Sequence, residues 1–181
     1  PGRGSGKEKG AGIMDYRGLD YQPEGSPLFL GIDYGFRNPF ACLWAQPIEN
    51  GERLVILREY YQAMRTTQEN ALAIQKIHQE AGYGQIAAVH PDPSSPEGAA
   101  VLAAVLGVPI IPPGLRNVAK GQELVRQWLK VRPDGWPGLL IHHRCKNLIR
   151  ELFFYLNHEP GKGKHHAVDA LRYLLLGWLG Y

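Results

Sequence analysis

Hydrophobic residues in the first third of the chain come in short runs separated by turn residues. Apolar runs begin at Leu28 and at Phe40, and the segment between them contains Gly35 and Pro39. Short apolar runs bounded by Gly and Pro are typical of strands joined by turns. A third run of the same kind covers residues 53–62. The pattern therefore predicts three strands that follow one another directly.

Helical spacing of apolar residues begins after these strands. Thr66 and Glu69 have the spacing of a capping box, and Gly82 is a plausible end of the helix that they open. Ser94 and Glu97 have the same spacing at the start of a later helix. The alternation in the rest of the chain predicts strands over 85–90, 108–113 and 138–143. It also predicts a helix from Ser94 or Ser95 to Gly107, and helices over 121–132, 146–157 and 166–180.

This order of elements determines the predicted fold class. Three consecutive strands followed by alternating strands and helices indicate an α/β protein, with a mixed sheet of five or more strands flanked by helices. Residues 1–27 are rich in Gly and polar residues and show no periodicity, so we expect a flexible linker or tail there. Residues 28–181 are then the folded domain.

Composition narrows the class of protein. The 181 residues are 44% hydrophobic, which suits one globular domain with a sizeable core. No apolar run reaches the ~18 residues of a membrane span, and the N-terminus lacks the apolar core of a signal peptide. We therefore expect no contact with a membrane. Cys42 and Cys145 are too few for a disulfide framework and are expected to be packed thiols in a reducing cytosol.

Charge is distributed unevenly along the chain. Residues 28–100 contain 5 Lys/Arg and 8 Asp/Glu, whereas residues 101–181 contain 11 Lys/Arg and 5 Asp/Glu. A basic half with acids gathered elsewhere suits a protein that binds a polyanion and places metal-binding carboxylates beside it. Charge alone fits solvated helix faces equally well.

Three carboxylates occupy positions where an open sheet builds a site. Asp33 ends the first apolar run, where a buried charge is costly unless it is paired or binds a cation. Asp92 follows the strand expected over 85–90, at the carboxyl end where ligands of such sheets bind. Asp169 lies near the start of the last predicted helix.

These acids have the chemistry of a two-metal site. Two Mg²⁺ or Mn²⁺ ions need hard oxygen ligands and one carboxylate that bridges them. Asp33 is the natural bridge, with Asp92 and Asp169 each completing one ion's shell. Each acid also has a simpler interpretation: Asp33 capping the turn at Gly35, Asp92 forming an Asx turn, and Asp169 favouring the positive end of a helix dipole.

Three segments together resemble a known family. They are "LFLGIDYGFRNPFA", "AAVHPDPSSPEG" and "NLIRELFFYL…KGKHHAVDALRYLL". Over residues 28–181 the chain is similar to the C-terminal nuclease domain of tailed-bacteriophage terminase large subunits. The resemblance implies a fold like that of ribonuclease H and the Holliday-junction resolvases. It also implies Mg²⁺- or Mn²⁺-dependent cleavage of concatemeric double-stranded phage DNA, with Asp33, Asp92 and Asp169 as metal ligands.

The resemblance also implies a cellular context. Genome packaging takes place in the cytoplasm of the infected bacterium, and the expected partners are an N-terminal ATPase domain, a small terminase subunit and a portal. Nothing in this chain can serve as the ATPase. We therefore expect an isolated nuclease domain, with the Gly-rich start as the remnant of an interdomain linker.

The chain departs from the family before its last aspartate. Family members often have an additional acid there, whereas this chain has Lys164, His165 and His166. His166 is therefore a candidate auxiliary group for a metal, a water or a phosphate, and the alternative is a histidine on the surface.

Basic residues of the second half are the candidates for binding the DNA duplex. Contacts from such residues go to phosphates and give salt-dependent binding with little sequence preference. The candidates are Arg116, Lys120, Arg126, Lys130, Arg144, Lys146, Lys162 and Lys164.

Other functions fit parts of the pattern. A junction resolvase or a ribonuclease H would use the same metals on another substrate. A sugar-kinase or actin-like module would share the "GIDYG" turn but needs a second lobe, for which this chain has no room. A non-catalytic DNA-binding or docking domain is a third possibility, and the three intact aspartates argue against it.

Overall fold

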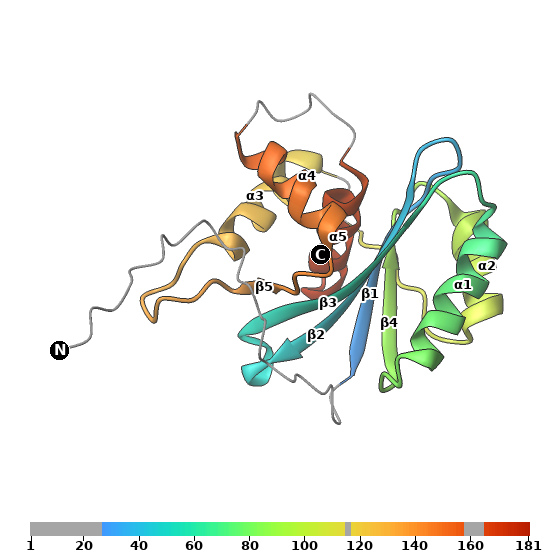
Figure 1. The fold of residues 1–181 in the computed structure, drawn as a ribbon, viewed down its shortest axis with the longest axis horizontal. Helices are drawn as coiled ribbons and strands as arrows, with labels where there is room; N and C mark the ends of the chain where they lie inside the picture. The colour runs from blue at the N-terminus through green and yellow to red at the C-terminus, as the bar shows by residue number, and fades with distance from the viewer. Residues whose placement is uncertain (1–26, 115–116, 158–164) are drawn as a thin grey trace.

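A five-stranded mixed sheet is the centre of the fold (Figure 1). The structure is a computed structural model that describes residues 27–114, 117–157 and 165–181. The strands are β1 (Leu28–Asp33), β2 (Phe40–Ile48), β3 (Arg53–Gln62), β4 (Ile86–Pro91) and β5 (Leu139–Ile141), in the order β4-β1-β2-β3-β5. β2 pairs antiparallel with both β1 and β3, while β4 runs parallel to β1 and β5 runs parallel to β3.

Helices cover both faces of this sheet. They are α1 (Thr67–Glu80), α2 (Pro96–Leu106), α3 (Val118–Leu129), α4 (Lys146–Asn157) and α5 (His166–Trp178), and a 3-10 turn, η1 (Glu49–Gly51), joins β2 to β3. Figure 1 shows α1 and α2 on one side of the sheet and α3, α4 and α5 on the other. The predicted α/β class with a mixed, helix-flanked sheet is confirmed. None of the helices in the described ranges has the length and hydrophobicity needed to span a membrane.

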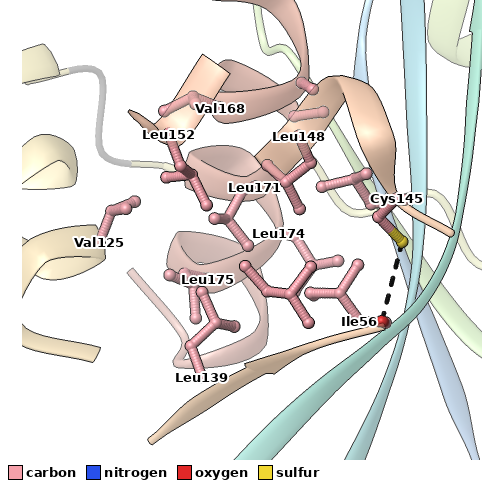
Figure 2. Close-up of a cluster of buried hydrophobic side chains, with 14 of the residues drawn as sticks. Ile56, Val125, Leu139, Cys145, Leu148, Leu152, Val168, Leu171, Leu174 and Leu175 are labelled. Carbon is pink, nitrogen blue, oxygen red and sulfur yellow. Dashed lines mark hydrogen bonds between the residues drawn. The ribbon is translucent and has the colours of Figure 1, made fainter. Parts of the chain in front are cut away.

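The two faces of the sheet bury separate cores because side chains alternate along each strand. In β2, Leu43 packs with α3, α4 and α5, while Cys42 and Trp44 face α1 and α2. Figure 2 shows the first of these cores, where leucines of α4 and α5 meet β5 and the Cys145 thiol donates to the Ile56 carbonyl, 3.8 Å away. Both cysteines are buried and free, as predicted.

Of the two capping boxes predicted from the sequence, the structure contains one and not the other. The capping box of Thr66 and Glu69 is present, so that prediction is confirmed. The second predicted capping box is wrong. Ser95 caps α2 by accepting a hydrogen bond from the Gly98 N–H. The Ser94 N–H instead donates to Asp92, because that side chain forms a turn before the helix begins.

Two further elements differ from the prediction. The strand expected over 108–113 is reduced to one bridge between Ile110 and Val89. Its three prolines lack the N–H that a strand ladder requires. α3 begins at Val118, capped by Asn117, so Gly121, the expected helix start, lies inside the helix.

Candidate active site

A glycine brings the last helix onto the first strand. A Cβ atom on Gly31 would lie 2.3 Å from the Ala170 carbonyl oxygen and 2.4 Å from the Leu174 Cβ. Real Cβ atoms do not tolerate contacts this short, so only glycine permits this approach of α5 to β1. The approach places the first turn of α5, with His166 and Asp169, beside the end of β1.

The strongest contact at this junction joins Asp33 to His166. The His166 Nδ1 and an Asp33 carboxylate oxygen are 2.7 Å apart, and the two side chains are 13% and 10% exposed. Burial raises the pKa of Asp33 to about 6, with Asp169 and Asp92 adding to the rise and His166 opposing it. The bond to Asp33 raises the pKa of His166. The interpretation of His166 as a surface residue is therefore wrong, and Asp33 bonds this histidine rather than the turn at Gly35.

Asp92 reaches the same place through the pairing of two parallel strands. Its backbone N–H donates to the Ile32 carbonyl at 2.9 Å, which fixes it next to the end of β1. One carboxylate oxygen accepts the Ser94 N–H at 2.8 Å, so Asp92 forms the Asx turn considered from the sequence. An open hollow of about 160 Å³ lies beside it, lined by Asp92, Pro93, Ser94, Val118, Arg172 and Tyr173.

Asp169 is held by a buried arginine one turn later in α5. The Arg172 Nε and one terminal nitrogen both donate to the same oxygen of Asp169, at 3.2 and 3.0 Å. The guanidinium also lies over the Tyr173 ring, 4.2 Å from its centroid. A Cβ on Gly121 of α3 would lie 2.6 Å from the Arg172 Cδ, so α3 leaves room for this side chain only because it has glycine there. Arg172 and Tyr173 are both buried.

The three aspartates share one arrangement. Each has one carboxylate oxygen bonded to a protein donor, namely His166, the Ser94 N–H or Arg172. The second oxygen of each has no bonded partner among the described residues. Within those residues, no three His, Cys, Asp or Glu side chains are already grouped so that they could hold a metal ion. The donor set nonetheless fits Mg²⁺ or Mn²⁺ in kind, because these ions prefer carboxylate oxygens.

Two glutamates that the sequence analysis did not single out support the site. Glu151 of α4 is buried and accepts hydrogen bonds from the Tyr61 hydroxyl at 2.7 Å, from the Ala167 N–H at 2.7 Å and from the Val168 N–H at 3.1 Å. It therefore caps α5 beside His166. Burial raises the pKa of Glu151, and the bonds that it accepts oppose the rise. Glu59 of β3 caps α4 in the same way, by accepting from the Asn147 and Leu148 N–H groups.

The predicted DNA-binding residues lie partly on the α3–α4 side of the sheet. Lys120, Lys130, Arg144 and Lys146 are exposed, whereas Arg126 is half-buried and lies over the Tyr155 ring. Arg116, Lys162 and Lys164 lie outside the described residues. None of these contacts with DNA is tested by the structure, and they stay predictions.

No family model and no curated protein matches the chain. Among solved structures, it is similar to the large terminase of a thermophilic bacteriophage, with 20% identity and a TM-score of 0.73 over 94% of this chain and 43% of that one. That thermophilic phage protein has also been solved in complex with ADP.

Two isolated nuclease domains are similar over nearly their whole length. The large terminase nuclease domain of P22 has 15% identity and a TM-score of 0.69, over 88% of this chain and 85% of that one. The corresponding domain of bacteriophage SPP1, solved with bound Mn, has 18% identity and a TM-score of 0.65, over 90% and 94%. The chain thus spans less than half of a whole large terminase, and its fold is that of the ribonuclease H-like nuclease domains of these proteins.

Proposed function

We propose that this domain is a metal-dependent endonuclease that cuts concatemeric viral double-stranded DNA during genome packaging. The observation that carries the proposal is that Asp92 and Asp169, from separate elements, lie close enough to Asp33 for their charges to raise its pKa, although the three are not grouped as an ion-binding cluster within the described residues. The shared fold of terminase nuclease domains supports the proposal, as does the Mn bound in the SPP1 domain.

Each side chain has a distinct role in this proposal. Asp33, Asp92 and Asp169 would hold two Mg²⁺ or Mn²⁺ ions, with Asp33 as the shared ligand and Asp92 and Asp169 each binding one ion. Such ions, when bound, lower the pKa of a water nucleophile and stabilise the leaving 3′ oxygen. His166 and Arg172 hold their aspartates in fixed orientations. His166 also compensates the buried charge of Asp33, which is otherwise costly.

The wider context of the proposal is a packaging machine. Lys120, Lys130, Arg144 and Lys146, with the other basic residues predicted from the sequence, would bind phosphates of the duplex. An ATPase domain, a small terminase subunit and a portal are the proposed partners, in the host cytoplasm. The ADP complex of the large terminase from the thermophilic bacteriophage is consistent with the first of these.

Plasmid cleavage tests the proposal. The purified domain is expected to nick or linearise supercoiled plasmid in Mn²⁺, and a chelator should stop the reaction. Asp33→Asn should abolish cleavage and leave DNA binding largely intact, while Glu80→Gln, an exposed acid at the end of α1, should cleave normally. Full cleavage by Asp33→Asn would contradict the proposed site. A strong preference for RNA–DNA hybrids or four-way junctions would contradict the proposed substrate.

A further inference from the structure

Two turns meet at the end of the sheet where β1 delivers Asp33. The Met64 N–H, after β3, donates to the Phe36 carbonyl, after β1, at 2.6 Å. Figure 1 shows both connections projecting beyond the sheet at the same end. Residues 34–39 and 63–66 are named the turn pair here. The site described above uses neither of these turns.

The turn pair presents apolar and cationic side chains to solvent. Phe36 is 52% exposed and Met64 is 67% exposed. Each is followed by an exposed arginine, Arg37 or Arg65. No acidic residue occurs in residues 34–39 or 63–66. An open hollow of about 350 Å³ lies between the two turns and the start of α1, lined by Tyr34, Gly35, Phe36, Arg65, Thr66 and Thr67.

Backbone geometry holds these side chains in place. A Cβ on Gly35 would lie 2.4 Å from the carbonyl oxygens of Asn38 and Pro39, so the first turn is tightly closed. Met64 has a φ of 60°. This left-handed conformation costs a non-glycine residue about 1 kcal/mol or more, so the surrounding contacts must impose it. The exposed side chains are therefore presented by a fixed backbone.

The covalent chain sets how far the turn pair lies from the proposed site. Phe36 follows Asp33 by three residues, and an extended chain spans at most ~3.6 Å per residue, so their Cα atoms lie within about 11 Å. If the scissile phosphate of a DNA duplex lies at Asp33, the nucleotides next to that phosphate lie within reach of the turn pair. Arginine is the side chain best suited to bind phosphate, and proteins that bind the minor groove of DNA insert apolar side chains such as Phe and Met there.

We propose that the turn pair is a DNA-contacting surface, in which Arg37 and Arg65 bind phosphates that flank the scissile one and Phe36 and Met64 pack in the minor groove between them. This inference rests on the proposed nuclease function. It adds a second DNA contact to the basic residues of α3 and α4, which lie on the opposite face of the sheet from α1 (Figure 1). The duplex is then held at the cleavage site from both sides.

Two double variants and a matched control test this contact. They are Arg37→Ala/Arg65→Ala, Phe36→Ala/Met64→Ala and the control Leu72→Ala/Lys76→Ala, which removes an exposed apolar and an exposed cationic residue from the middle of α1. Circular dichroism establishes that each variant is folded. Binding of a fluorescent duplex is measured in EDTA over a range of salt concentrations, and plasmid cleavage is measured in Mn²⁺.

Each variant has its own expected signature. Loss of two phosphate contacts should weaken binding about tenfold at low salt and reduce the slope of log K against log salt by roughly 2. Loss of the apolar pair should weaken binding about fivefold with the slope unchanged, because no phosphate contact is removed. Both variants should raise KM and keep kcat within about twofold, since neither touches the reacting atoms. The control should match the parent protein.

The results separate this inference from the proposed function. If the parent protein cleaves DNA and both variants keep its affinity, salt slope and KM, the turn-pair contact is overturned. Equal losses in the control pair would also overturn it, because the effect would then be a general one of surface change. If the parent protein neither binds nor cleaves DNA, the nuclease proposal itself fails.

Discussion

At the scale of single residues, the site depends on glycines that leave space as much as on the side chains that make contacts. Gly31 lets α5 lie directly on β1, and Gly121 leaves room for the Arg172 side chain that holds Asp169. Neither glycine has a positive φ, so space, not backbone freedom, explains both. A methyl group at Gly31 would move α5, which carries Asp169, whereas a methyl group at Gly121 would displace the Arg172 side chain.

Gly31→Ala tests this close packing. The added methyl group would meet a backbone carbonyl and a helix Cβ, neither of which can turn aside, so α5 must move away from β1. We expect a loss on the order of 3 kcal/mol in the free energy of unfolding, measured by urea titration, together with weaker Mn²⁺ binding. Gly114→Ala is the control. Its added methyl group meets its nearest neighbour at 3.9 Å, and it should change stability by less than about 0.5 kcal/mol. Equal stability of the two variants would contradict the account of Gly31.

At the scale of elements, two carboxylates couple a strand to two helices in succession. Glu59 of β3 caps α4, and Glu151 of α4 caps α5. Each cap satisfies N–H groups that would otherwise lack partners at a helix start. The sequence could not indicate this, because a glutamate inside an amphipathic helix is ordinary and its partners lie 16 residues away and more. The position of His166 and Asp169 therefore depends on Glu151, which lies within the segment NLIRELFFYL but has no sequence signature of a cap.

Glu151→Ala should loosen the start of α5. The Ala167 and Val168 N–H groups would lose their acceptor, at a cost of about 2–4 kcal/mol in stability, and the Mn²⁺ concentration for half-maximal cleavage should rise about tenfold or more. Glu151→Gln should retain most of the stability of the parent protein and most of its Mn²⁺ affinity. Its amide oxygen can accept the two backbone N–H groups, and its amide nitrogen can donate to the Tyr61 hydroxyl.

Glu59→Ala is the matched control for that experiment. It also removes the cap of a helix, and it should lower stability by a similar amount, but it leaves in place Glu151 and the two N–H groups of α5 that donate to it. Its Mn²⁺ dependence should therefore stay within about threefold of the parent protein. A parallel shift in both alanine variants would show that Glu151 acts on stability alone.

At the scale of the whole molecule, the order of elements was predictable and their mutual contacts were not. Short apolar runs bounded by turn residues identified β1, β2 and β3, and helical spacing gave the bounds of α4, so the α/β class followed. Asp33 stood out because a charge ended a buried strand. The burial of His166 and Arg172 was not predictable, because periodicity describes one helix at a time, while α5 packs against the sheet and α3 together. When residues distant in the sequence bury a side chain, the pattern of apolar residues around that side chain does not reveal it.

Ion binding should stabilise the whole domain, because the unfolded chain does not assemble the three aspartates. Mn²⁺ at about one hundred times its dissociation constant adds about 2.7 kcal/mol to the free energy of unfolding. For a chain of this size, this raises Tm by roughly 5–11 °C, measurable by calorimetry without DNA. Asp33→Asn and Asp169→Asn should each lose most of that rise, and Glu80→Gln should keep it. A rise that persists in both asparagine variants would place the ion elsewhere and remove the chemical basis of the proposed nuclease site.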